Sequence, residues 1–151
     1  MPSVRSPCKH QLRHVRQTKA VRSGYDAAML KLVLIGVLGA LGAVCRAVLS
    51  GWLNPKDLGG GMPWGTIAAN LIGSLLIGVL IGLSGRLPEP WRSALTTGFL
   101  GSLTTFSTFN LELVELVSKG SPGLAALNLV MQLGLGLAGA AVGLLIGRAL
   151  V

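Results

Sequence analysis

The stretch Gly98-Phe99-Leu100-Gly101-Ser102-Leu103-Thr104-Thr105-Phe106-Ser107-Thr108-Phe109-Asn110 decides the fold, because it interrupts a long apolar segment with glycine and hydroxyl residues. Thr and Phe are mediocre helix formers, Gly is a poor one, and hydroxyl side chains compete for backbone hydrogen bonds. We therefore expect a helix that enters this stretch to break near Gly101–Thr105. In a membrane, such a break persists only where it is buried in protein or lines a watery cavity. The alternative is a kinked packing helix rich in Ser and Thr.

The composition of the whole chain is that of a membrane protein with one domain. Hydrophobic residues make up 51% of the 151 residues and charged residues 12%, whereas a soluble domain carries about 25% charged residues. The net charge of +8 is concentrated in residues 1–28, which hold six basic residues and one acidic residue. We expect this segment to be a disordered cytoplasmic tail, and it does not resemble a signal peptide.

Four apolar runs follow the tail, each near the roughly 20 residues that a helix needs to cross a bilayer. Tryptophans fall at their ends, as interfacial anchors do. The connections are short, so consecutive helices are expected to be antiparallel neighbours. The sequence thus predicts an all-α integral membrane fold with four transmembrane helices, the third of them broken. The runs cover about residues 29–52, 64–83, 91–117 and 124–147.

Polar side chains gather at a few points inside these runs. Arg46 lies about two-thirds of the way along the first run, and a charge at that depth marks either a pathway or an arginine that reaches back to the interface. Asn70 shares a helix face with Thr66 and Ser74. Its amide has two hydrogens to donate to a dehydrated anion, and the alternative is an ordinary hydrogen bond between helices.

The third and fourth runs add further polar groups. Glu112 and Glu115 lie near the end of the third run, and Glu115 reads as an interfacial residue. Asn128 and Gln132 are one turn apart in the fourth run, which then carries a ridge of glycines at spacing four for tight helix contact. That ridge comprises Gly139, Gly143 and Gly147.

The sequence shows few residues in patterns that enzymes use for catalysis. The histidines, His10 and His14, both lie in the tail, and the two cysteines, Cys8 and Cys45, have no metal-binding or disulfide spacing. No phosphate-binding loop or nucleophile motif is present. The polar groups inside the membrane instead favour a pathway for a small solute.

Three blocks of this sequence resemble the CrcB/Fluc family of small fluoride channels. The central stretch is similar to that family's Gly-x-x-Gly-x-Leu-Thr-Thr-Phe-Ser-Thr-Phe signature. Gly39 to Arg46 is similar to its Gly-x-x-Gly-Ala-x-x-Arg motif, and Gly65 to Ser74 to its Gly-Thr-x-x-x-Asn-x-x-Gly-Ser motif. The resemblance covers about Leu30 to Arg148, which includes all four runs.

This resemblance implies a fluoride channel rather than an enzyme, built as an antiparallel, dual-topology homodimer in the cell (inner or plasma) membrane. Fluoride leaves the cytoplasm down its gradient through two pores along the subunit interfaces, which reduces fluoride toxicity. A structural sodium ion (Na+) sits at the dimer centre. We expect the backbone carbonyls of Gly101 and Thr104 from both chains to bind it.

The resemblance also assigns roles along the pore. Phe106 and Phe109 are expected to contact fluoride with their electropositive ring edges, and Asn70 to donate a hydrogen bond. Ser107 and Thr108 form a polar track, which Glu112 continues. Arg46 is assigned to a vestibule that concentrates anions by its field.

The sequence departs from the family pattern at two places. Where the family often has a tyrosine and a hydroxyl in the fourth helix, this chain has Asn128 and then Gly134 or Gly136, so that helix's pore contribution stays open. The basic tail opposes dual topology under the positive-inside rule. Either translation begins at Met29, or this subunit pairs with an oppositely oriented homologue.

Two other classes remain to be compared. A small multidrug-type transporter also has four short helices in a dual-topology dimer, but it needs a membrane carboxylate in its first helix. Here that helix carries Arg46, whose positive charge is opposite to that of the required carboxylate. A non-conducting scaffold protein would use its phenylalanines for packing only and would pass no ion.

Overall fold

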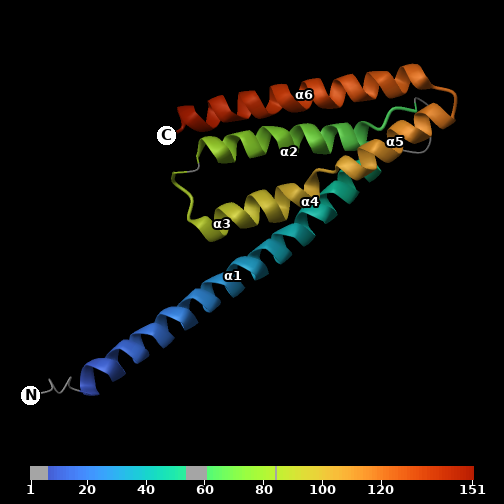
Figure 1. Ribbon diagram of the computed structural model, residues 1–151. Coiled ribbons are helices and arrows are strands. Elements are labelled where there is room, and N and C mark those ends of the chain that lie inside the picture. The colour runs from blue at the N-terminus through green and yellow to red at the C-terminus, as the bar shows by residue number, and fades with distance from the viewer. Residues whose placement is uncertain (1–6, 54–60, 84) are drawn as a thin grey trace, which may run out of the picture.

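The computed structural model describes the backbone of residues 7–53, 61–83 and 85–151, and side chains from residue 22 onward. In this part of the chain all regular structure is helical, and the helices pack as an all-α membrane protein (Figure 1). The elements are α1 (Pro7–Leu53), α2 (Trp64–Gly82), α3 (Glu89–Ser93), the π-helix η1 (Ala94–Leu100), α4 (Gly101–Leu103), α5 (Phe106–Ser118) and α6 (Pro122–Ala149).

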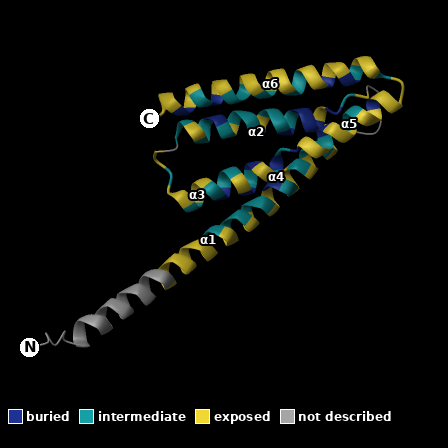
Figure 2. Ribbon diagram, viewed as in Figure 1, coloured by how far each residue is buried: buried dark blue, intermediate teal, exposed yellow. Residues whose placement is uncertain are grey.

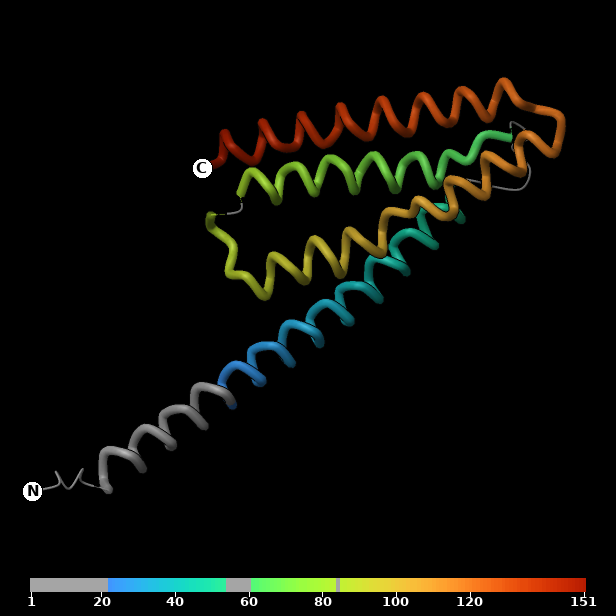
Figure 3. Tube along the Cα trace, in the orientation of Figure 1, coloured from blue at the N-terminus to red at the C-terminus, as the bar shows by residue number. Residues whose placement is uncertain are grey.

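The coloured part of α1 in the chain trace, residues 22–53, already extends beyond the other helices at its N-terminal end (Figure 3). The 47 residues of α1 would measure about 70 Å at 1.5 Å per residue, more than twice the roughly 30 Å of a hydrocarbon core. Residues 7–28, which the sequence assigned to a disordered tail, continue the first helix in the structure. A helix that is already nucleated adds further residues at little cost, and the Arg, Lys, Gln and Ala of this segment are good helix formers. Residues 1–6 lie outside the described residues.

Helices α2 and α6 run in the same direction and touch through glycines. A Cβ atom built on Gly78 would lie 2.2 Å from the Ala140 carbonyl oxygen, and one built on Gly143 would lie 2.0 Å from the Leu75 carbonyl oxygen. Only glycine allows the two backbones to approach this closely. The small-residue ridge predicted for the fourth run is thus confirmed as a helix contact.

The first run packs in the same way against the third. A Cβ atom on Gly42 would lie 2.2 Å from the Phe99 carbonyl oxygen, and one on Gly98 would lie 2.7 Å from the Ile35 carbonyl oxygen. Backbone contact between α1 and η1 therefore requires glycine on both helices. This contact holds the segment that leads into the break.

The third predicted span is broken where the sequence indicated. Thr104 and Thr105 are extended, with φ and ψ of −82° and 153° at Thr104 and of −151° and 116° at Thr105. Helix α4 ends before them, and α5 begins after them with Thr105 as its N-cap. The break is confirmed and falls at the end of the predicted range. The π-helical turns of η1 just before it were not expected.

The outer surface of the bundle is apolar, and the residues buried inside it are few (Figure 2). Among the described residues, three helices are long and apolar enough to cross a membrane: α1 from Arg22, α2 and α6. The third predicted span is divided by the break into η1, α4 and α5, of which the longest has 13 residues. That these pieces together cross the membrane as a fourth span stays a prediction.

Candidate functional site

The break in the third span is held by the side chain of Asn70, which comes from α2. Asn70 Oδ1 accepts a hydrogen bond from the Thr105 backbone nitrogen at 2.8 Å, and Asn70 Nδ2 donates to the Thr105 carbonyl oxygen at 3.3 Å. One amide therefore satisfies both backbone groups of an extended residue inside the membrane, where unpaired groups are costly. Asn70 thus makes the hydrogen bond between helices that the sequence left open as the alternative, and its contact with fluoride stays a prediction.

A second partner of Asn70 starts a chain of amides that leads into α6. Asn70 Nδ2 also donates to Gln132 Oε1, and Gln132 Nε2 donates to Asn128 Oδ1 at 3.2 Å. Asn128 is completely buried, and its Nδ2 has no hydrogen-bond partner among the described residues. We refer to Thr105, Asn70, Gln132 and Asn128 as the amide relay.

The two phenylalanines after the break lie together but in different surroundings. Their ring centroids are 5.8 Å apart with an interplanar angle of 50°. Phe109 is 4% exposed, whereas Phe106 is 73% exposed. The two rings lie against one another within one chain, and the Phe106 ring is exposed on the surface of the subunit.

Hydroxyl groups cluster at the start of α5. Thr105 Oγ1 accepts from the Thr108 backbone nitrogen at 3.2 Å, donates to Thr108 Oγ1 at 3.0 Å, and lies 3.3 Å from Ser107 Oγ. Ser107 is exposed and Thr108 is half-buried. The predicted track residues are therefore brought together with Thr105, which the sequence analysis did not name as a track residue.

Glu112 continues this side of α5 towards α2. Its Oε1 accepts a hydrogen bond from Thr66 Oγ1, and its Oε2 is buried without a partner among the described residues. Thr66 shares the face of Asn70, as its spacing predicted. Glu115 is exposed and pairs with Lys119 at 3.1 Å, which fits an interfacial position.

The carbonyl groups of Gly101 and Thr104 have both lost their usual helical donors. In a continuous helix the Thr105 N–H would donate to Gly101 and the Thr108 N–H to Thr104. Here the first donates to Asn70 Oδ1 and the second to Thr105 Oγ1. These two carbonyl oxygens are neutral ligands of the kind that a hard monovalent cation takes, so the residues fit the expected sodium site.

Comparison with known proteins decides the family. The model for the family described as CrcB-like protein, Camphor Resistance (CrcB), matches residues 33–144. The chain belongs to the CrcB family. This match contains the break, the amide relay and both phenylalanines.

Curated CrcB relatives carry the name of a fluoride channel. The chain is 45% identical over 118 residues to "Fluoride-specific ion channel FluC 1" of Symbiobacterium thermophilum, covering 76% of this chain and 95% of that protein. It is 42% identical over 124 residues to "Fluoride-specific ion channel FluC" of Syntrophotalea carbinolica, covering 80% and 100%. The protein of the same name from Agrobacterium fabrum is 38% identical over 123 residues, covering 80% and 98%.

Arg46 of this CrcB protein is half-buried in α1 and forms no ion pair with the residues that the structure describes. Its surroundings neither support nor oppose a vestibule, which stays a prediction. In the same described part of the chain, no group of three His, Cys, Asp or Glu side chains is placed to hold a metal.

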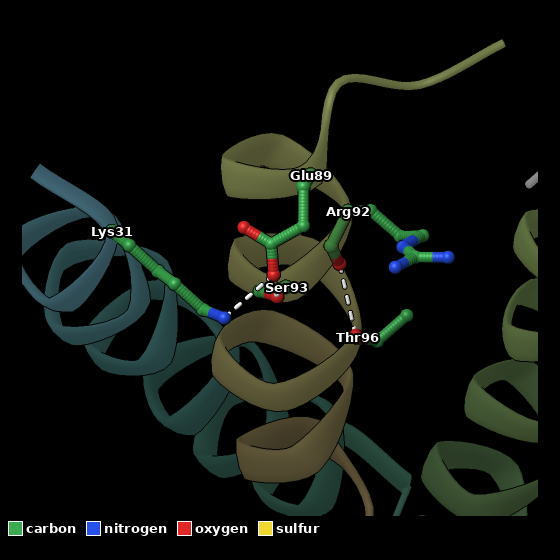
Figure 4. Close-up of polar contacts among 5 residues, drawn as sticks. All are labelled: Lys31, Glu89, Arg92, Ser93 and Thr96. Atoms are coloured by element: carbon green, nitrogen blue, oxygen red, sulfur yellow. Dashed lines mark hydrogen bonds and ion pairs between the residues drawn. The ribbon is translucent and has the colours of Figure 1, made fainter. Parts of the chain in front are cut away.

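One interhelical pair was missed by the sequence analysis. Lys31 Nζ in α1 lies 2.6 Å from Glu89 Oε1 in α3, and Ser93 Oγ donates to the same oxygen at 2.8 Å (Figure 4). The hydrogen bond from Lys31, followed by that from Ser93, lowers the pKa of Glu89 below its ordinary value. The pair ties the first helix to the start of the broken span. Residues 58 positions apart leave no local signal of such a contact.

Proposed function

We propose that this chain is a fluoride channel. The observation that carries the proposal is the chain's identity of 42–45% to proteins named fluoride-specific ion channels, over nearly their whole length. The CrcB match also excludes an enzyme as the class of protein. Ring edges and hydroxyl groups at the break would contact an anion weakly, which suits conduction.

Phe106 and Phe109 would contact the ion with their ring edges. An aromatic edge is electropositive and attracts an anion without holding it tightly. Both rings follow the break directly, and the hydroxyl groups of Ser107 and Thr108 gather around Thr105 Oγ1 at the start of the same helix. The arrangement supports a path with rings on one side and a polar track on the other, with Glu112 as its continuation.

A homodimer of oppositely oriented subunits would complete this path. Phe106 and Gly101 are exposed in the single chain, so a second copy has to cover them if the pore is to be closed from lipid. Two copies facing one another would bring together two Gly101 and two Thr104 carbonyl groups. A sodium ion held by these four oxygens would stabilise the dimer centre and would not lie in the fluoride path.

The long first helix bears on the orientation. Residues 7–28 extend the first span as a basic helix, which favours a cytoplasmic N-terminus under the positive-inside rule. The family match begins only at residue 33. Dual topology therefore requires either a start at Met29 or pairing with an oppositely oriented homologue.

The alternatives make different predictions. A multidrug-type transporter needs a carboxylate inside its first span, and residues 29–52 contain none. A scaffold protein would pass no ion at all.

Cells deprived of their own fluoride exporters test the proposal. Expression of this chain is expected to lower internal fluoride and to restore growth in fluoride medium, since fluoride would leave across the cell membrane. Unchanged internal fluoride, with the protein present in the membrane, would contradict the proposed function.

Arg46→Gln is expected to lower the rate of release, because the field of the arginine gathers anions at the vestibule.

A further inference from the structure

The exposed residues of the broken span are arranged symmetrically about the break. Between residues 94 and 110, the exposed residues are Thr97, Gly101, Phe106, Ser107 and Asn110. Gly101 and Phe106 begin and end the segment that contains the extended residues, and Thr97 and Asn110 lie four positions outside it on either side. Apart from Ser107, the exposed positions therefore follow the same order from either end, as the contact face of a two-fold antiparallel pair of this span would.

Thr97 and Asn110 are polar residues on an outer surface that is otherwise apolar. Both lie well inside the predicted span of residues 91–117. Neither side chain forms a hydrogen bond with any residue that the structure describes, whereas the neighbouring Thr96 hydroxyl donates to the Arg92 carbonyl oxygen of its own helix at 2.9 Å. An amide that faces lipid without a partner is costly, so Asn110 requires a partner from outside the chain.

The depths of the two side chains match when a second copy runs in the opposite direction. Thr97 lies about 10 Å before the middle of the break, and Asn110 lies about 13 Å after it, because Thr104 and Thr105 are extended. Helical side chains tilt towards the N-terminus of the helix, which moves the Thr97 hydroxyl away from the middle and the Asn110 amide towards it. This tilt reduces the difference in depth. Parallel copies would instead place each of these residues opposite its own equivalent.

We propose that Asn110 of each copy donates a hydrogen bond to the Thr97 hydroxyl of a second, oppositely oriented copy, so that the contact occurs twice in a dimer. The amide hydrogens of Asn110 need an acceptor, and the threonine hydroxyl is one. Gly101 and Phe106 lie opposite one another in the same arrangement, and the glycine leaves room for the exposed ring. This inference rests on the proposed function and names the subunit contact beside the break.

Cysteine cross-linking in the membranes of expressing cells tests the contact, in the full chain with Cys8 and Cys45 replaced by serine. Thr97→Cys in one tagged chain and Asn110→Cys in a differently tagged chain are co-expressed and treated with a mild oxidant. We expect covalent dimers that carry both tags, and at least about fivefold fewer from either variant expressed alone, because only the mixed pair brings the two thiols within reach. No covalent dimer from the mixed pair, or an equal yield from each variant alone, would overturn the contact.

Dimer affinity in detergent gives an independent readout. Asn110→Leu and Thr97→Val each remove one side of both hydrogen bonds and should lower the association constant about tenfold. The double variant should fall no further, because the two partners of one bond are not independent. Thr96→Val is the matched control and should change the association constant by less than about threefold, since its hydroxyl donates within its own helix.

Additive losses in the double variant would overturn the contact as well. If either substitution prevents folding, the cross-linking result decides the question. Release of fluoride from vesicles separates this inference from the function on which it rests. A parent protein that releases no fluoride, although the mixed pair cross-links as expected, would contradict the proposed function and support the contact.

Discussion

Asn70 makes two hydrogen bonds with the backbone of Thr105: its Oδ1 accepts from the Thr105 nitrogen at 2.8 Å, and its Nδ2 donates to the Thr105 carbonyl oxygen at 3.3 Å. A single side chain from α2 thereby replaces helical hydrogen bonds that are lost at the break. The extended conformation of the break is stabilised by a residue of a different helix. The backbone conformation of the break therefore depends on a residue of another helix.

Replacement of Asn70 by leucine should destabilise the fold strongly. Two backbone groups of Thr105 would lose their partners in a dry environment, at about 1–3 kcal/mol each. We expect the free energy of unfolding in detergent to fall by about 2–4 kcal/mol. Ser74→Ala, one turn further on the same helix, is the control and should change it by less than about 0.5 kcal/mol. Equal effects of the two substitutions would show that Asn70 does not hold the break.

Replacement of Phe106 or Phe109 by isoleucine should distinguish an effect on the rate of fluoride release from an effect on stability. Either change removes an electropositive ring edge, so fluoride release should fall about fivefold to tenfold. Phe109 is buried and Phe106 is not. Only Phe109→Ile should therefore lower the free energy of unfolding of the single subunit, by about 1 kcal/mol. Release at the parent rate from folded dimers of both variants would exclude the aromatic contact with the ion.

The contact between α2 and α6 should fail when a methyl group is added at Gly143. Its Cβ would lie 2.0 Å from the Leu75 carbonyl oxygen, so the helices must move apart, at about 1–3 kcal/mol. Gly36→Ala is the matched control, since a Cβ there meets nothing within 4 Å. Thermal unfolding of both variants in detergent measures the difference. A Gly143→Ala protein as stable as the control would refute the close packing.

A bulky residue at Gly101 should disturb the dimer and spare the subunit. Within one chain, a Cβ at Gly101 would meet only the Thr96 carbonyl oxygen, at an ordinary 3.6 Å. Any loss of association in Gly101→Leu therefore comes from the second copy or from the cation between the copies. Mass measurement of the detergent-solubilised protein should show monomers, while Gly123→Leu stays dimeric.

Sodium gives the matching test of the same site. Prolonged replacement of sodium by a large organic cation should weaken the parent dimer, because the carbonyl groups of Gly101 and Thr104 would lose their shared ligand. A dimer that is indifferent both to sodium removal and to Gly101→Leu would contradict the proposed cation at its centre.

The break could be predicted from the sequence because its cause is local. Glycines, hydroxyl residues and phenylalanines in direct succession weaken the helix wherever the chain goes. The glycine ridge of α6 was readable for the same reason, since its spacing of four fixes one face.

The hydrogen bonds that stabilise the break could not be predicted from the sequence. The sequence placed Asn70 on a polar face, but its partners Thr105 and Gln132 lie 35 and 62 positions away. Asn128 and Gln132 were seen as neighbours, yet the direction of their hydrogen bond depends on a backbone N–H of another helix. Residues 7–28 were expected to be disordered from their charge, although a helix already formed by the first span extends through them.

The most direct test of the account is electrogenic anion release from vesicles that contain the purified protein and a potassium ionophore. A fluoride channel should release fluoride only when potassium can leave with it, and the same vesicles should retain chloride. Fluoride release that needs no potassium movement would indicate a coupled transporter. Release of chloride at the same rate as fluoride, or no release of either ion, would contradict the account.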